Sequence, residues 1–368
     1  MTDNIFADDD AGVYLHLIRP LITAVLLLGS ALSASAVCPF NIPEVTIAPQ
    51  QIAGFNWGPV IRPMNDACVD HIQVENGNAL AWYVSGVKGV YVTKDNGANW
   101  KKPLNGSSGA LLWEPVHQFA YAGVGNILYF SRDHGANWVP VHTFLKPVTS
   151  LLAFAAQNTL YIGLGWDNHI DDSGIFTSNL GGGAMTFHPF APNQPIGKGL
   201  IVWTISRDPM SGNLYAGTEI FDHQPQPYKP PFWRSTNNGN TWTNVQNNLP
   251  GHVIDSAVQP NGYVYALTEG SGVWGSSTMG NSWIAPNPGN PSLGVSLLMD
   301  PATPARLYAG RLNGGTQTGG IFRSINAGNT FQLVGLKGAT VSDVALNGTL
   351  TRIYVAAYSS GIYTSPVP

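Results

Sequence analysis

The segment Ser131-Arg132-Asp133-His134-Gly135-Ala136-Asn137-Trp138 decides the fold of this chain, because its pattern recurs along the sequence. Each residue type in it suits a hairpin turn. Glycine adopts a backbone with positive φ that other residues resist. The aspartate accepts backbone N–H bonds across the turn, the serine adds another bond, and the tryptophan covers apolar surface. The segment therefore predicts a tight polar turn between two strands.

The same turn motif recurs along the chain in copies that match it more or less closely. A second close copy is Thr93–Trp100; weaker copies run from Ser235 to Trp242, from Ser276 to Trp283 and from Ser324 to Phe331, and a sixth, from Thr177 to Phe187, is stretched by three glycines. The aspartate position holds Asn237, Thr278 and Asn326 in the weaker copies. These residues keep an acceptor but lose the charge that a calcium site relies on, so we expect no metal at the turns.

A strand pattern precedes the turns and counts the repeating units. It reads glycine, aliphatic, aromatic, any residue, then serine or threonine, and its aromatic residues lie 38 to 57 residues apart. Those residues are Tyr91, Tyr129, Phe176, Trp233, Trp274, Phe322 and Tyr363. A four-stranded unit at this period predicts an all-β fold, a seven-bladed β-propeller. A six-bladed ring is the alternative if the loose copy at Tyr129 is not a blade.

The last unit ends immediately after its third strand, at Tyr363-Thr364-Ser365-Pro366. A strand at Glu44-Val45-Thr46-Ile47 near the other end of the chain could supply the missing fourth strand. Pairing the two ends would protect an open sheet edge. We therefore expect residues 37–368 to form one domain, a propeller whose ring is closed by an N-terminal strand.

The recurring turn resembles the Asp-box of the bacterial neuraminidase repeat family, over roughly residues 70–368. Sialidases, xyloglucan-cleaving endoglucanases, sortilin-type receptor domains and photosystem II assembly factors share this motif. The resemblance implies Asp-box hairpins on one face of a propeller. It also implies that ligands bind on the opposite face, around the central channel.

Several members of that family fit this sequence poorly. A sialidase would have an arginine triad and an Arg-Ile-Pro motif, whereas the nearest match here is Ile61-Arg62-Pro63 and arginine is rare. The xyloglucan-cleaving relatives place their acids in a cleft between two propellers, and this chain has length for one. A basic patch like that of the assembly factors is not visible, and the cysteine-rich module of the sortilin-type domains is absent.

Composition narrows the function further. Of 368 residues, 42 are glycine and 27 proline, and charged residues make up 10%, which disfavours helical bundles. The net charge of −4 gives no basic surface for phosphates, so we expect no nucleic-acid partner. No HExxH, GxSxG or phosphate-loop motif occurs, and we expect no cofactor.

The N-terminal 36 residues are typical of a secretory signal peptide. The apolar run Leu21–Ala36 ends in Ala34-Ser35-Ala36, a small-x-small cleavage pattern, and is short for a membrane span. The leader is acidic, which is unusual for a signal, so retention as an anchor is the alternative. We expect a secreted or periplasmic protein without a stable membrane span after cleavage. There Cys38 and Cys68 form one disulfide or remain two thiols.

Two connections are longer than their counterparts, and unequal loops in a repeat fold are natural binding sites. They are Trp166–Ser173 in the third blade and Glu219–Pro230 in the fourth. The candidate catalytic carboxylates in them are Asp167, Asp171, Glu219 and Asp222. The candidate ligand-binding residues are Trp166, His169, Asp172, His223, Tyr228, Glu269 and Arg311.

Carboxylates beside aromatic rings suit a sugar, because rings stack on pyranoses and carboxylates bond hydroxyls or act as acid and base. Solvated surface loops are the simpler interpretation. We expect an exported monomer that binds a carbohydrate or protein ligand on the face opposite the Asp-boxes. Glycoside hydrolysis by the third- and fourth-blade carboxylates is one alternative, and a non-catalytic assembly or scaffold role is another.

Overall fold

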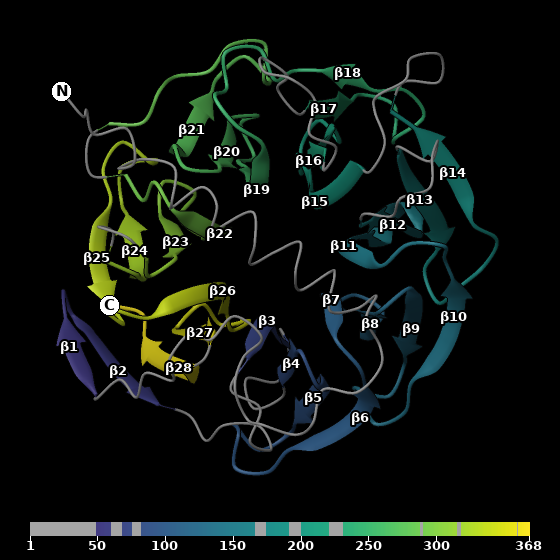
Figure 1. The fold of residues 1–368 in the computed structure, drawn as a ribbon, viewed down its shortest axis with the longest axis horizontal. Coiled ribbons are helices and arrows are strands. Elements are labelled where there is room, and N and C mark those ends of the chain that lie inside the picture. The colour runs from purple at the N-terminus through teal and green to yellow at the C-terminus, as the bar shows by residue number, and fades with distance from the viewer. Residues whose placement is uncertain are drawn as a thin grey trace, which may run out of the picture.

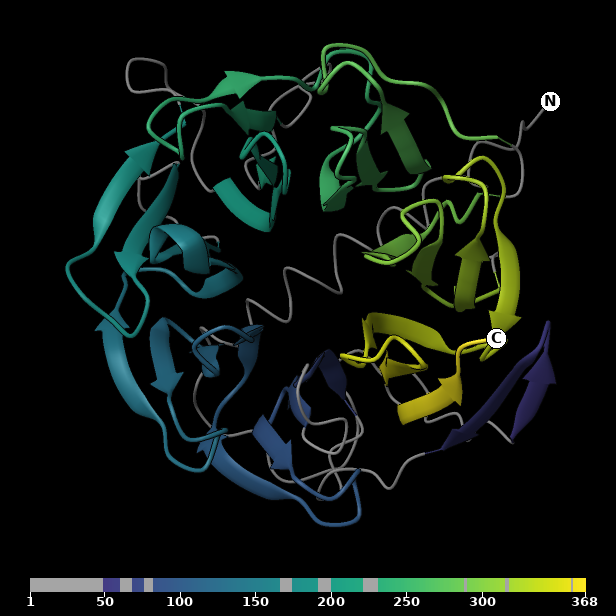
Figure 2. The same ribbon diagram turned by 180° about the vertical axis from the view of Figure 1, so that it is seen from behind.

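In the computed structural model, seven small antiparallel sheets are arranged radially around a central axis (Figures 1 and 2). The described residues are 49–59, 68–75, 82–165, 174–190, 200–220, 231–287, 290–314, 318–358 and 360–368. This arrangement confirms the seven-bladed all-β propeller and excludes the six-bladed ring. Within the described ranges no helix is long and apolar enough to cross a membrane.

Each blade runs outward from the axis in strand order, and the first three blades have four strands each. Blade 1 contains β3 (Val69–Val74), β4 (Trp82–Gly86), β5 (Gly89–Thr93) and β6 (Lys101–Asn105). Blade 2 contains β7 (Ser108–Glu114), β8 (Phe119–Val124), β9 (Ile127–Ser131) and β10 (Val139–Thr143). Blade 3 contains β11 (Val148–Phe154), the 3-10 helix η1 (Ala155–Gln157), β12 (Thr159–Leu164), β13 (Gly174–Asn179) and β14 (Thr186–Pro189).

The remaining blades vary at their outer edges. Blade 4 contains β15 (Leu200–Arg207), β16 (Leu214–Ile220), β17 (Phe232–Ser235) and β18 (Thr243–Asn244). Blade 5 contains β19 (Val253–Val258), β20 (Val264–Thr268) and β21 (Gly272–Ser276). Blade 6 contains β22 (Gly294–Met299), β23 (Leu307–Arg311), β24 (Gly320–Ser324) and β25 (Gln332–Gly335). Blade 7 contains β26 (Thr340–Leu346), β27 (Arg352–Tyr358), β28 (Gly361–Pro366), β2 (Phe55–Pro59) and β1 (Gln50–Ile52).

An N-terminal strand closes the ring, as expected, but the strand is Phe55–Pro59 and not the expected Glu44–Ile47. Strand β2 pairs antiparallel with β28, joining Gly58 to Thr364 and Pro59 to Tyr363. Figure 1 shows β1 and β2 in purple beside the yellow β28. The stretch Glu44–Ile47 lies outside the described residues. The edge of the last sheet is thus paired with chain from the opposite terminus.

The closing strand also supplies the tryptophan that blade 7 lacks. In blade 1, Trp100 precedes Lys101, the partner of Val92 on the third strand. In blade 7, Trp57 precedes Gly58, the partner of the equivalent Thr364. Trp57 is buried, and its indole N–H donates to the Val334 carbonyl of blade 6 over 2.7 Å. The seventh turn motif is therefore completed by residues from the other end of the chain.

The turns themselves have the bonds that their sequence predicts. In the turn Thr93–Trp100, the Asn99 N–H donates to Asp95 Oδ1 over 2.8 Å and the Gly97 N–H donates to Thr93 Oγ1 over 2.9 Å. Where asparagine replaces the acid, Asn237 Oδ1 accepts the Thr241 N–H over 2.8 Å. We call these five turns, 93–100, 131–138, 235–242, 276–283 and 324–331, the box turns.

The stretched turn of blade 3 departs from the expected pattern. Met185, rather than Phe187, precedes the residue that pairs with Thr177, so Met185 takes the place of the box tryptophan. Phe187 pairs instead with Phe176 on the neighbouring strand, with ring centroids 5.0 Å apart. The extra glycines lengthen the turn and shift the register. Phe187, which lies near the expected spacing, is therefore part of the fourth strand and not of the turn.

The box turns also join neighbouring blades through a ring of buried tyrosines. The second strand of every blade carries one at the same position: Tyr83, Tyr121, Tyr161, Tyr215, Tyr265, Tyr308 and Tyr354. A methyl group on Gly135, in the box turn of blade 2, would lie 2.6 Å from Cε1 of Tyr83 in blade 1. The glycine is thus needed for close contact as well as for its φ of 72°.

The innermost strands are bonded to one another around the axis. Each has a β-bulge near its start, which lets nearby side chains turn toward the next blade. Asp255 of β19 accepts the Leu297 N–H of blade 6 over 2.7 Å, and the equivalent Asp343 of β26 accepts the Ile72 N–H of blade 1 over 3.0 Å. The second bond lies at the junction where the ring closes.

Among its described residues blade 5 has no regular fourth strand, and an asparagine side chain makes one of the hydrogen bonds that such a strand would make. Ile284 forms a single bridge with Gly275, and the Asn290 carboxamide accepts the Val273 N–H over 2.8 Å. The outward backbone groups of β21 at these two positions are thereby bonded. The missing strand leaves Ile284 exposed but leaves little open edge.

Cys68 is disulfide-bonded and stands at the start of blade 1. The sequence holds one other cysteine, Cys38, which lies outside the described residues. No free cysteine occurs among the described residues. Of the two expectations, the disulfide rather than the free thiol therefore holds for Cys68.

We predict that Trp57→Ala weakens the ring far more than the same change at Trp100. Trp57 is buried against blade 6, so its removal leaves a large cavity and should lower the free energy of unfolding by about 3–5 kcal/mol. Trp100 occupies the same repeat position but is half-buried. Urea denaturation followed by tryptophan fluorescence and circular dichroism compares the two; equal losses would contradict the role of Trp57 in closure.

A second prediction concerns acid. The backbone N–H of Asn137 and its side chain hold the pKa of Asp133 down to about 2, from an ordinary 3.8. The lowered pKa stabilises the folded state above about pH 4, and this contribution is lost as the pH falls toward 2. Asp133→Asn should leave stability at pH 7 nearly unchanged, as Asn237 does naturally, and should reduce the loss between about pH 4 and pH 2.5 in urea titrations. A variant as acid-sensitive as the parent would refute this.

Candidate functional site

Two glutamates occupy the same repeat position in neighbouring blades. Glu219 is near the end of β16 in blade 4, and Glu269 follows the end of β20 in blade 5. On the first strand of each blade the bulge begins at one residue, Val202 in blade 4 and Val253 in blade 5. Each glutamate directly follows the residue that pairs with that valine. The other five blades hold Val87, Gly125, Gly165, Leu312 and Tyr358 at this position. Second strands end on the face opposite the box turns, so both carboxylates lie there.

His252 links the two carboxylates. It immediately precedes β19, and its carbonyl accepts the Glu269 N–H over 3.0 Å. Its Nε2 lies 3.6 Å from Glu219 Oε1 and contacts Glu269 Oε2. Glu219 is 3% exposed and His252 is 9% exposed. The sequence therefore brings together, in a buried position, two carboxylates that both face one imidazole nitrogen.

Trp203 completes this group from the adjacent inner strand. It stands at the bulge in β15, between Val202 and Thr204. Its indole N–H donates to Glu219 Oε2 over 2.6 Å. Part of its ring packs against the core between blades 5 and 6. We call Trp203, Glu219, His252 and Glu269 the blade 4–5 cluster.

The chemistry of the cluster follows from its charges. Two carboxylates outnumber the one imidazole between them, which favours a cationic or hydrogen-bond-donating group nearby. No group of three or more candidate metal ligands was found among the described residues. For glycoside hydrolysis, a sugar must fit between two carboxyl groups. Here His252 fills the space between Glu219 and Glu269.

Arg311 belongs to the same face but is directed along its own blade. It ends β23, and its Nε–H donates to the Thr318 carbonyl over 2.7 Å. The guanidinium lies over the Phe322 ring at 4.2 Å, and burial lowers its pKa. These contacts give Arg311 a role in holding the second connection of blade 6.

The remaining predicted site residues lie outside the described residues. They are Trp166, Asp167, His169, Asp171, Asp172, Asp222, His223 and Tyr228. Their connections begin at described positions on the same face: the blade 3 connection follows Gly165, whose N–H donates to the Pro147 carbonyl over 2.6 Å. The blade 4 connection begins directly after Glu219 and Ile220.

Three residues that sequence reasoning missed stand near these connections. His252 and Trp203 belong to the blade 4–5 cluster, and Lys146 is a buried lysine beside Pro147 at the entry to blade 3. None lies in a recognisable motif. The one signal in the sequence is that Glu219 and Glu269 share a repeat position. The residue opposite Glu269, just before the first strand of blade 5, is His252.

No protein-family model matches this chain, and no curated protein sequence matches it. Among solved structures, YCF48 from Cyanidioschyzon merolae is similar with a TM-score of 0.60 at 15% identity, over 85% of this chain and 98% of that one. A second structure, YCF48 bound to D1 peptide, has a TM-score of 0.59 at 12% identity, over 89% and 99% of the two chains.

An ancestral GH74 enzyme has a TM-score of 0.64 at 16% identity, over 83% of this chain and 45% of that one. The extracellular domain of BT4673 from B. thetaiotaomicron has a TM-score of 0.64 at 14% identity, over 86% and 40%. This chain thus spans less than half of those two proteins and nearly all of YCF48. At these identities the likeness shows the shared seven-bladed propeller fold.

The charge balance of the blade 4–5 cluster gives a prediction. His252→Asn removes the group that faces both the buried Glu219 and the half-buried Glu269, and should lower the free energy of unfolding by about 3–5 kcal/mol at pH 7. Adding Glu269→Gln removes one of the two charges and should recover part of that loss. Urea denaturation of the single and double variants measures both steps. A double variant that is less stable than His252→Asn would contradict this account.

Proposed function

We propose that this chain is an exported, monomeric propeller of the Asp-box class that binds a ligand on the face opposite the box turns, over blades 3 to 5. The observation that carries the proposal is the blade 4–5 cluster. Two carboxylates stand at one repeat position in two blades out of seven, Glu219 buried and Glu269 half-buried, and the long second connection of blade 4 begins directly after Glu219. A propeller needs no such charges for its fold, because the other five blades do without them.

Export is supported by the chain's cysteine chemistry and its N-terminal sequence. Residues 1–36 read as a cleaved signal peptide, and disulfides such as that of Cys68 persist in oxidising compartments. The Asp-box assignment is supported by the side-chain bonds of the box turns, which repeat in five blades with aspartate, asparagine or threonine as acceptor.

A protein ligand is the form of the proposal that we favour. The negative charge of the cluster suits a basic group of a peptide, and YCF48, whose whole length this chain matches, has been solved with a D1 peptide bound. A carbohydrate is the other form, and it relies on Trp166 and Tyr228 as stacking platforms beside the carboxylates.

Glycoside hydrolysis is the second candidate function. It is favoured by the concentration of carboxylates in the blade 3 and 4 connections and by the shared fold with GH74 enzymes. Because Glu219 is buried and its oxygens face Trp203 and His252, we assign the acid and base roles in this alternative to Asp167, Asp171 or Asp222. Turnover would then survive Glu219→Gln and be lost in one of the aspartate-to-asparagine variants.

The test is a binding screen of the mature protein on peptide and glycan arrays, followed by titration of the hits with variants. Glu269→Gln and Trp166→Ala should each weaken binding by on the order of tenfold or more. Asp133→Asn is the matched control, because it neutralises one carboxylate on the opposite face, where asparagine occurs naturally in other blades.

Binding that is unchanged in both site variants would overturn the proposed site. Ligands found on the peptide array alone or on the glycan array alone decide between the two forms. Hydrolysis of a polysaccharide that is lost in Asp167→Asn, Asp171→Asn or Asp222→Asn would establish the enzyme. A protein without ligand or turnover in these screens would favour the scaffold role.

A further inference from the structure

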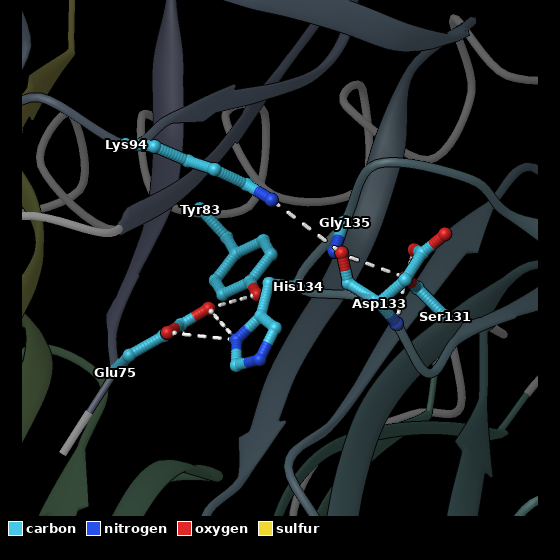
Figure 3. A network of polar contacts seen from close by, with 7 residues as sticks. All are labelled: Glu75, Tyr83, Lys94, Ser131, Asp133, His134 and Gly135. Carbon is cyan, nitrogen blue, oxygen red and sulfur yellow. Dashed lines mark hydrogen bonds and ion pairs between the residues drawn. The ribbon is translucent and has the colours of Figure 1, made fainter. Parts of the chain in front are cut away.

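A buried glutamate on the opposite face joins blades 1 and 2. Glu75 follows the end of β3, and its side chain is 3% exposed. At the same repeat position in blade 2, Glu114 bonds to its own turn, accepting the Val116 and His117 N–H groups over 2.7 and 2.8 Å. The Glu75 carboxylate instead accepts a hydrogen bond from the Tyr83 hydroxyl and faces His134 of the next blade (Figure 3).

His134 reaches Glu75 because of its place in a box turn. It precedes Gly135 and has a φ of 55°, a left-handed backbone that directs the turn toward blade 1. Its Nδ1 lies 3.0 Å from each oxygen of Glu75, and its ring lies 5.6 Å from that of Trp113. The imidazole is 41% exposed, so it can exchange protons with solvent while its partner is buried.

The other charged groups around this pair are engaged elsewhere. Tyr83 stays neutral, because burial first and then the nearby Glu75 charge raise its pKa. Asp133 accepts bonds from Asn137 and Ser131 within its own turn. Lys94 of blade 1 directs its ammonium to the Asp133 carbonyl at 3.5 Å (Figure 3). Among the described residues, His134, which is a cation when protonated, is the ion-pair partner of Glu75.

We propose that Glu75 and His134 form a pH-sensitive latch between blades 1 and 2. A buried carboxylate is costly to keep charged unless a positive group pairs with it. Protonated His134 supplies that charge, and the blades are held together. When His134 loses its proton as the pH rises, the carboxylate keeps hydrogen bonds but no counter-charge, and the junction loosens. The latch therefore stabilises the junction more at lower pH than at higher pH.

This inference goes beyond the proposed ligand site, which lies on the other face and shares no residue with the latch. The junction is also where the glycine of the blade 2 box turn packs on Tyr83. Loosening it therefore exposes an interior contact between blades. A change of pH in the surrounding medium would act on the stiffness of this sector of the ring.

Hydrogen exchange measured by mass spectrometry tests the latch. Peptides that cover residues 69–75 and 131–138 should exchange more slowly at about pH 5.5 than at about pH 8, after correction for the intrinsic rate, by on the order of tenfold in protection. His134→Asn should abolish that difference. Asparagine keeps the left-handed backbone, as Asn96 and Asn238 do at the equivalent positions of their box turns. Glu75→Gln should abolish it as well.

His117→Asn is the matched control. His117 has the same exposure and contacts a buried glutamate through Nδ1 over 2.9 Å, but the pair lies within one blade. Its replacement should leave the pH difference at the blade 1–2 junction intact. If Glu75→Gln does not fold, the parent protein and His134→Asn still decide the question. A parent without a pH difference, or a His134→Asn variant that keeps it, overturns the latch.

Discussion

The ring depends on a contact between neighbouring blades, in which the glycine of a box turn packs against the tyrosine of the blade before it. A methyl group on Gly135 would lie 2.6 Å from Tyr83, and one on Gly328 would lie 3.3 Å from Tyr265. A larger residue would push the two sheets apart, as well as resist the positive φ. At these junctions the motif is therefore a joint between sheets, and it limits how closely the sheets can pack.

The number of blades and the turns could be predicted from sequence because both arise from local chemistry that repeats. Closure by an N-terminal strand could also be predicted, but not which segment forms it. Strand β2 carries a tryptophan without the rest of the motif, and its partner lies some 300 residues away (Asn56 and Ser365 are 309 apart). The contact of Gly135 with Tyr83 cannot be predicted from the sequence for a related reason. Both residues are visible in the repeat pattern, but only the packing of one unit on the next brings them together.

For the candidate site, the sequence marks Glu219 and Glu269 as separate loop residues. The structure joins them through His252, which no motif marks. An isolated histidine before an apolar strand gives no signal of its own, because its role comes from the register that places it opposite Glu269. The latch at Glu75 has the same origin. In both places a polar residue of one blade meets a histidine that the next blade positions.

The closing strand has a consequence for how the chain is made. Strand β2 precedes all seven blades in the chain and β28 follows the other strands, so the seventh sheet cannot be completed until β28 has been synthesised. Until then Phe55 and Trp57, both buried in the finished ring, remain in water together with the surface of blade 6 that they cover. In a crowded compartment a second copy of the chain can offer the same strand, so slow closure favours strand-exchanged dimers.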